Sequence, residues 1–293
     1  MKRKIIGVGV LLTALTIFFR EDVGGLFASV NSKEVHAGTS KDHTSSAYSV
    51  DVMKQWHLPQ ELNEVSGIAY IGDNRFACVQ DEEGYIFIYN TAAEKIEKKI
   101  AFAGAGDYEG ITVKGSTAYV VRADGVIYQV QDFATAAKPA VTKFNTPLTV
   151  ENNVEGLTYD RKNNRLLLAL KDQDLVSQDK KGIYAFELGN NSFNKTPVYT
   201  IAMDHEMLGN KKKKNLGLSA IGLHPTSGEV YLLDGPKSRL IVLDKAGVLK
   251  VVKELGKQFA QPEGITFDEA GALYISNERG KKTAANIMQV AVR

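Results

Sequence analysis

A short unit built around Gly-Ile, most often preceded by Glu, recurs along almost the whole chain and restricts its fold more than any other feature. The five copies are residues 64–70, 107–113, 153–159, 217–223 and 261–267. Measured from glycine to glycine, with Ala220 standing for glycine in the fourth copy, they are 43, 46, 64 and 44 residues apart. Repeats of about 40 to 50 residues are typical of β-propellers, in which each repeat forms one blade.

Two further strand-like runs follow each copy. After the second copy, for example, β-prone residues 117–121 and 126–130 are separated by a turn containing Asp124 and Gly125. Short runs punctuated by Gly, Asn and Asp indicate strands rather than helices. The chain is therefore predicted to be all-β, a β-propeller of five four-stranded blades whose outermost strands are the most variable.

The interval of 64 residues between the third and fourth copies is longer than a blade requires. It contains two polar stretches, residues 175–181 and 203–218, which we interpret as loop insertions into a five-bladed ring. The alternative is a sixth, degraded blade within this interval.

The ends of the repeated region predict how the ring closes. Residues 49–56 form a strand-like run before the first copy, whereas the last repeat ends at Arg293 with no room for a fourth strand. We expect the N-terminal strand to complete the last blade, which removes free sheet edges. The predicted propeller spans residues 48–293 and is expected to be a monomer.

The N-terminus has the charge pattern of an export signal. Three basic residues, 2–4, precede fifteen apolar or small residues, 5–19. Fifteen helical residues span about 22 Å, less than the roughly 30 Å of a bilayer core, so residues 1–20 are predicted to be a cleaved signal sequence or a short membrane anchor. A polar linker, residues 21–47, follows. Both interpretations place the propeller on the periplasmic or extracellular face.

Positive and negative charges are balanced along the chain. With 36 basic and 34 acidic residues, the net charge is +2. No basic stripe follows a phosphate backbone, so nucleic acid is not expected as a partner. The one dense basic run, residues 211–214, is predicted to be a solvated loop.

Three of the five copies carry a glutamate directly before the glycine, namely Glu109, Glu155 and Glu263. The first strand of each propeller blade lines the central channel, so these carboxylates are expected to converge at one of its mouths. Converging carboxylates repel one another unless they are protonated, paired with cations or bound to a metal. Among metals, a hard, oxygen-preferring cation such as calcium fits them best.

Further charged residues follow the second strand of several blades. Asp81 and Asp234 are predicted to add ligands to this metal site, while Arg122 and Lys171 are placed to pair with the carboxylates directly. Ion pairs and hydrogen bonds between blades are therefore the alternative explanation of the acidic positions.

Motifs for other chemistry are missing from the sequence. The five histidines are scattered without metal-ligand spacing, so zinc is not expected. Cys78, the only cysteine, lies in an apolar run and is predicted to be a buried, inert thiol. There is no Gly-x-Ser-x-Gly nucleophile motif and no phosphate-binding glycine loop.

Over residues 48–293 the sequence resembles the SdiA-regulated family, the YjiK-like bacterial proteins. The resemblance rests on the motifs at 64–70, 153–160 and 261–278. It implies a five-bladed propeller outside the cytoplasm, with a calcium ion in a family site and no established reaction. Ser219 and Ala220 depart from the motif, so the fourth blade is not expected to contribute to a metal site, and Glu109 and Glu155 are the first candidates.

The sequence leaves two candidate functions open. The first is a non-catalytic, calcium-binding module of the cell envelope that displays loops to a protein, peptide or glycan. The second is a divalent-metal-dependent hydrolase resembling gluconolactonases or propeller phytases, which requires an open coordination position for water. The mixed residues after the second strands, among them Arg122 and Lys171, favour the first.

Overall fold

The computed structural model describes residues 49–209 and 216–293. The predicted export segment, the linker and the lysine run lie outside these residues. None of the helices within them has the length and apolar character needed to cross a membrane.

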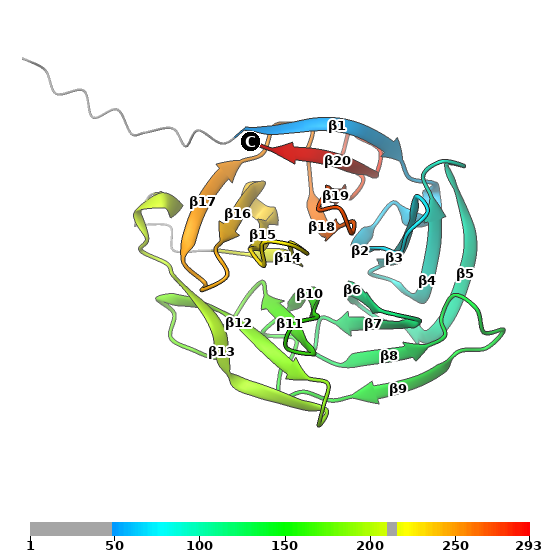
Figure 1. Ribbon diagram of the computed structural model, residues 1–293, viewed down its shortest axis with the longest axis horizontal. Coiled ribbons are helices and arrows are strands. Elements are labelled where there is room, and N and C mark those ends of the chain that lie inside the picture. Colours follow the sequence, from blue (N-terminus) through cyan, green and yellow to red (C-terminus); the bar gives the residue numbers. More distant parts are fainter. Residues whose placement is uncertain (1–48, 210–215) are drawn as a thin grey trace, which may run out of the picture. The chain divides into compact units, whose positions relative to one another are not determined.

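The described chain forms five four-stranded sheets arranged as blades around a central channel (Figure 1). Blade 1 comprises β2 (Val65–Tyr70), β3 (Arg75–Gln80), β4 (Glu83–Asn90) and β5 (Lys95–Ala105). Blade 2 comprises β6 (Tyr108–Lys114), β7 (Thr117–Arg122), β8 (Ile127–Gln131) and β9 (Ala140–Phe144). Blade 3 comprises β10 (Val154–Asp160), β11 (Arg165–Leu170), β12 (Lys180–Glu187) and β13 (Ser192–Ala202). Blade 4 comprises β14 (Leu218–Leu223), β15 (Val230–Asp234), β16 (Arg239–Leu243) and β17 (Leu249–Glu254). Blade 5 comprises β18 (Pro262–Phe267), β19 (Leu273–Asn277), β20 (Asn286–Val292) and β1 (Val50–His57).

The predicted five blades are confirmed. The long interval belongs to blade 3, because β12 and β13 run for 8 and 11 residues and a loop of nine residues separates β11 from β12. The short 3-10 helix η2 (Glu206–Leu208) follows β13. The described residues of this interval contain no sixth sheet.

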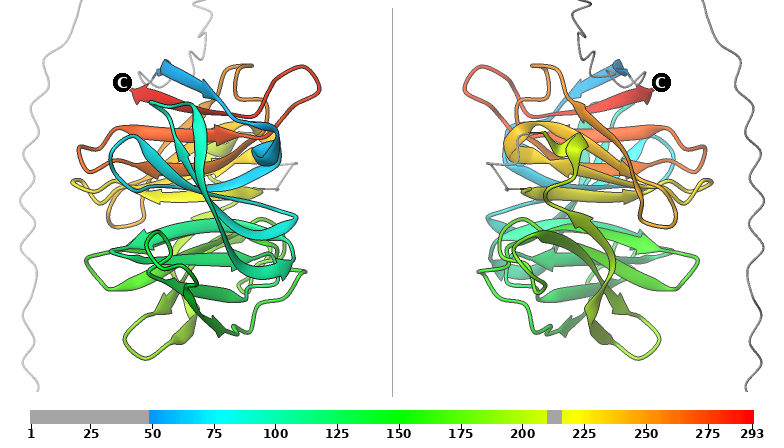
Figure 2. Two further views of the ribbon diagram at one scale, coloured as in Figure 1. Left: turned by 90° about the vertical axis from the view of Figure 1, so that its right-hand side faces the viewer. Right: turned by 90° about the vertical axis from the view of Figure 1, so that its left-hand side faces the viewer.

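The predicted closure of the ring is also confirmed. Strand β1 pairs antiparallel with β20, from Val50 opposite Val292 to His57 opposite Asn286. Figure 2 shows the blue strand β1 beside the red strand β20, the last of the chain. The first and last strands of the described chain therefore share one sheet, so the N-terminal strand completes blade 5.

The hydrophobic core consists of five apolar clusters, each formed by two neighbouring blades. Successive side chains of a strand point to opposite faces of its sheet. In β3, Ala77 and Val79 therefore pack toward blade 2, whereas Phe76 and Cys78 pack toward blade 5. Cys78 is buried as predicted, and this burial raises the pKa of its thiol.

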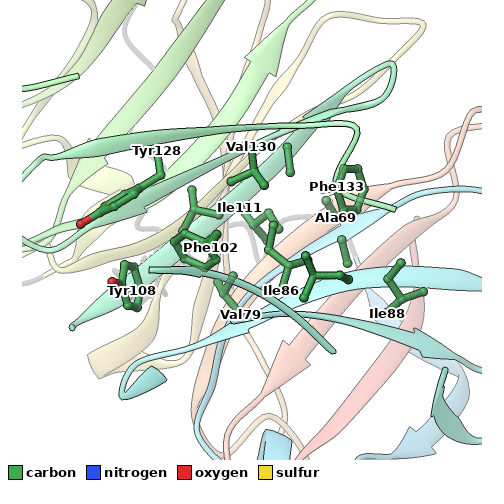
Figure 3. Packing of buried hydrophobic residues seen from close by; sticks show 14 residues of the cluster. Ala69, Val79, Ile86, Ile88, Phe102, Tyr108, Ile111, Tyr128, Val130 and Phe133 are labelled. Atoms are coloured by element: carbon green, nitrogen blue, oxygen red, sulfur yellow. The ribbon is translucent and has the colours of Figure 1, made fainter. Parts of the chain in front are cut away.

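Aromatic rings join blades 1 and 2. Phe102 of β5 meets Tyr108 of β6 and Tyr128 of β8 edge to face, with ring centroids 4.9 and 5.4 Å apart (Figure 3). Such pairs add about 0.5 to 1.5 kcal/mol each beyond the area they bury. Aromatic packing therefore contributes to holding blades 1 and 2 together.

The repeated glycines allow the first strands of neighbouring blades to approach closely. A Cβ atom added to Gly110 would lie 2.8 Å from the carbonyl oxygen of Glu155 and 2.8 Å from the Cβ of Leu157, both in blade 3. The φ angle of Gly110 is not positive, so the requirement is space rather than backbone conformation. Gly110 is therefore required for the close approach of the two strands.

Replacing Gly110 with Ala is therefore expected to lower the free energy of unfolding by about 2 kcal/mol, the usual cost of overpacking a rigid contact. Chemical denaturation measures this loss. Gly104 is the matched control, because in the described part of the chain an added Cβ there meets no atom within 4 Å. Gly104→Ala should change stability by less than about 0.5 kcal/mol, and equal effects of the two substitutions would contradict the close-approach explanation.

Candidate functional site

The five first strands bring one equivalent side chain each to one mouth of the channel. These strands are β2, β6, β10, β14 and β18, the innermost strands in Figure 1. The residue before the glycine, or before Ala220, is Ser66, Glu109, Glu155, Ser219 or Glu263. We call the three glutamates the carboxylate ring. As predicted from the sequence, all three line one cavity in the channel.

The two serines explain why blades 1 and 4 lack a ring glutamate. Ser66 donates a hydrogen bond of 2.6 Å to the carbonyl oxygen of Tyr108, and Ser219 donates one of 2.8 Å to that of Pro262. Each serine thus ties its own first strand to that of the next blade. These two blades use the position for assembly, whereas blades 2, 3 and 5 place a carboxyl group there.

Apolar side chains line the channel next to the carboxylate ring. They are Ile68, Ile111, Leu157, Ile221 and Ile265, each two residues further along its strand. The space open to the centre of a water-sized sphere is about 10 Å³, roughly what one water molecule requires. The cavity therefore has room for a single ion or water molecule.

Glu155 is the ring member with the smallest exposed fraction. It is 4% exposed, and its Oε1 accepts a contact of 2.7 Å from Lys171 Nζ and a hydrogen bond of 3.1 Å from Asn153 Nδ2. Among the described residues, its other oxygen, Oε2, has no hydrogen-bond partner. The predicted pairing of Lys171 with a ring carboxylate is therefore confirmed, and it leaves one buried oxygen unsatisfied.

Burial and mutual repulsion raise the pKa values of the ring carboxyls above those of ordinary glutamates. Burial, with the nearby charges of Glu155 and Asp107, raises the pKa of Glu109 to about 10. Burial and the charge of Glu155 raise the pKa of Glu263 to about 8. For Glu155 burial raises the pKa to about 7, because the Lys171 ammonium offsets part of the effect. The ring therefore disfavours three negative charges and favours any added positive charge.

A second layer of acidic groups lies around the ring. Burial raises the pKa of Asp81, whose Oδ1 has no hydrogen-bond partner among the described residues. Burial and the charge of Glu64 raise the pKa of Glu278 to about 7, and its Oε2 accepts a hydrogen bond of 2.8 Å from Gln261. The charges of Asp81 and Glu278 also act on Glu263, so these groups form one electrostatic unit.

Two of the residues singled out in the sequence have other partners. Asp234, predicted as a metal ligand, is 0% exposed and its Oδ2 is paired with Arg239 at 2.5 Å. Its Oδ1 accepts a hydrogen bond of 3.3 Å from the Gly217 amide. Arg122 is paired with Asp124 in the adjoining turn rather than with the ring. In blades 2 and 4 these positions thus stabilise the hairpin end.

Sequence reasoning missed the residues that hold Lys171 in place. Lys181 is 4% exposed, and its Nζ donates to the carbonyl oxygens of Lys171 at 2.9 Å and Asp172 at 2.7 Å. Asn153 Nδ2, which contacts Glu155, also donates to Asp172 at 3.0 Å. A lysine within an otherwise apolar strand, as in Lys181-Gly-Ile-Tyr, was the only available signal.

The donor chemistry fits calcium, although the ligands are not gathered around one point. Within residues 49–209 and 216–293, no three His, Cys, Asp or Glu side chains stand together as a ready metal site. The carboxylate ring nevertheless offers only hard oxygen donors, which calcium prefers. The unpartnered oxygens of Glu155 and Asp81 are the acceptors that such an ion requires.

Comparisons with known proteins agree with the fold. The model of the SdiA-regulated family matches residues 43–280, and no curated protein matches the chain. The structure is similar to the glutaminyl cyclase of Myxococcus xanthus, with a TM-score of 0.59 and 11% identity over 83% of this chain and 96% of that one. It is also similar to a PQQ-bound aldose sugar dehydrogenase of Streptomyces coelicolor, with a TM-score of 0.51 and 13% identity over 84% and 98%. At these identities the likeness is one of fold alone.

Proposed function

The chain belongs to the SdiA-regulated family, and from this premise we propose that it is a non-catalytic, calcium-binding β-propeller that acts outside the cytoplasm. The ion would sit at the acidic mouth of the channel. The loops around that mouth would present a surface to an envelope protein, peptide or glycan.

One observation carries the proposal, namely the unpartnered Oε2 of Glu155. A buried carboxylate oxygen without a partner is costly, because the group has lost water and gained nothing in return. The other two ring carboxyls add to this cost, since burial and repulsion oppose their ionisation. A divalent cation satisfies the oxygen and removes the repulsion in a single step.

The proposed ligands are Glu109, Glu155 and Glu263, with Asp81 as a further donor. Calcium takes six to eight oxygens in a flexible arrangement, so water would complete its shell. Asp234 is left out of the proposed set, because both of its oxygens already accept from Arg239 and the Gly217 amide. The ion's chemistry here is electrostatic, holding the mouths of three blades together.

Calcium is expected to raise the melting temperature of the protein, and a chelator is expected to reverse the rise. At about 100 times the dissociation constant a single ion stabilises by about 2.7 kcal/mol, or roughly 5 to 10 °C for a domain of this size. Differential scanning fluorimetry with calcium and with EGTA measures the shift. An unchanged melting temperature, together with no bound metal in the purified protein, would refute the proposal.

Glu263→Gln sharpens this test. Among the described residues no ion pair uses Glu263, so its neutral analogue breaks no salt bridge and removes only a proposed ligand. We expect calcium affinity to fall at least about tenfold, which corresponds to 1.4 kcal/mol. Glu97→Gln, at an exposed position of β5, is the matched control and should bind like the wild type. The same loaded protein, assayed with lactones and phosphoesters, tests the hydrolase alternative.

A further inference from the structure

The ammonium of Lys171 is paired with one carboxylate of the ring. Its Nζ is 2.7 Å from Glu155 Oε1. Burial lowers the pKa of Lys171, but the charges of Glu155, Glu263 and Glu109 outweigh this effect and the net shift is upward. All three ring carboxylates therefore act on the same ammonium, which serves the ring as a cation supplied by the chain itself.

The backbone of Lys171 is held firmly at the mouth. Its amide donates to the carbonyl oxygen of Asn153 at 2.8 Å, and its own carbonyl accepts from Lys181 Nζ at 2.9 Å. The side chain of Lys171 reaches solvent, because it is 29% exposed, whereas that of Glu155 is 4% exposed. The ammonium can therefore move toward solvent while the loop that carries it stays in place.

A divalent ion and this ammonium exclude each other. Two unit charges 4 Å apart repel strongly at the low effective dielectric of a partly buried site, and a divalent ion doubles that repulsion. Both also require Glu155, the most buried carboxylate of the ring.

We propose that Lys171 is the affinity-determining residue of the cation site, competing with the bound ion for Glu155 through its tethered ammonium. The inference rests on the proposed function, since it concerns the same site. The ion and the ammonium alternate at Glu155: binding of one releases the other to solvent. The site is consequently weak and exchangeable, whereas the ring alone would hold calcium tightly.

A plain structural ion pair makes a different prediction. If Lys171 only stabilised the fold, its loss would lower the melting temperature and leave calcium affinity unchanged or reduced. If Lys171 competes, its loss lowers the melting temperature of the calcium-free protein and raises calcium affinity at the same time. The change in calcium affinity therefore separates the two hypotheses, because the melting temperature of the calcium-free protein falls in both cases.

The experiment is isothermal titration calorimetry of the folded protein with calcium chloride at pH 8 and low salt, with melting curves on the same samples. The variants are Lys171→Gln, which removes the charge, and Lys171→Arg, which keeps it. Lys162→Gln, at an exposed turn between β10 and β11, is the matched control. We expect Lys171→Gln to bind calcium at least tenfold more tightly and to show a larger calcium-induced rise in melting temperature, whereas Lys171→Arg and Lys162→Gln stay within about threefold of the wild type.

The outcomes distinguish failure of the competition by Lys171 from failure of the proposed calcium binding. Tighter calcium binding by Lys171→Gln than by the wild type supports the competition. If the wild type binds no measurable calcium while Lys171→Gln does, the competition is supported and the proposed calcium binding of the wild type is refuted. Wild-type binding that is unchanged or weakened in Lys171→Gln overturns the competition and leaves the proposed function standing. Absence of binding in both proteins, with both folded by their melting curves, overturns both.

Discussion

Replacing Asp234 with Asn is expected to lower the free energy of unfolding by about 3 to 5 kcal/mol, the usual cost of leaving a buried charge without its partner. Asp234 is 0% exposed, and its Oδ2 lies 3.0 Å from Arg239 Nε and 2.5 Å from Arg239 Nη2. Arg239 also donates to the carbonyl oxygen of Leu208 at 3.0 Å, so the pair joins blade 4 to helix η2. Urea denaturation followed by fluorescence or circular dichroism measures the loss.

Two further variants show whether the cause is the unpaired charge. Asp73 pairs with Arg75 at 2.8 Å on the surface, where the two side chains are 86% and 38% exposed, so Asp73→Asn should cost less than about 1 kcal/mol. The joint replacement of Asp234 by Leu and Arg239 by Met removes both charges and should recover most of the stability. A loss below about 1 kcal/mol for Asp234→Asn would show that Arg239 finds compensation elsewhere.

The architecture was predictable because a propeller blade has a fixed length and a fixed order of strands. The recurring Gly-Ile unit marked each first strand, and the turns after it marked the next two. The closing strand was also predictable, because the last repeat lacked a fourth strand and residues 49–56 had no other partner. Strand β1 indeed runs over Val50–His57 and completes blade 5.

The partners of the charged residues were not predictable to the same degree. Asp234 ends β15 opposite Leu218, a place that Gln80 takes opposite Val65 in β3, so Asp81 lies one residue further on. Asp81 keeps an oxygen unpartnered among the described residues, whereas Asp234 is paired with Arg239. The difference depends on one residue of the next strand, five positions after Asp234. A periodic pattern identifies equivalent backbone positions but does not say which side chain a local neighbour will bind.

The carboxylate ring shows how the fold and the charges are linked. Where the five first strands converge, the residue before the glycine can bind the neighbouring strand, line the channel or do both. Ser66 donates to the Tyr108 carbonyl and also lines the cavity, whereas Glu155 lines it with a carboxyl group. Each glutamate of the ring instead places a buried carboxyl group at this position, and ionising that group has a cost to stability that a function has to explain.

These buried carboxyls determine how stability should depend on pH. In Glu109 and Glu263 the folded-state pKa values, about 10 and about 8, lie above the ordinary value of 4.5. The folded state therefore binds protons more tightly than the unfolded state across this interval. Its stability is highest when both groups are protonated, and it falls as the pH rises above about 4.5 and up to these folded-state values.

In the absence of divalent cations, the wild type is thus expected to lose stability between pH 5 and pH 8.5, by at most about 1.4 kcal/mol per pH unit for each group. Glu109→Gln imitates the protonated carboxyl, so it should match the wild type within about 0.5 kcal/mol at pH 5 and exceed it by at least about 2 kcal/mol at pH 8.5. Urea denaturation in EGTA at the two pH values measures both differences, with Glu97→Gln as the surface control. A variant that is less stable than the wild type at pH 8.5 would mean that Glu109 is ionised and paired in the folded protein. Added calcium should flatten the wild-type profile, because an ion that binds the carboxylates replaces the protons that stabilise them.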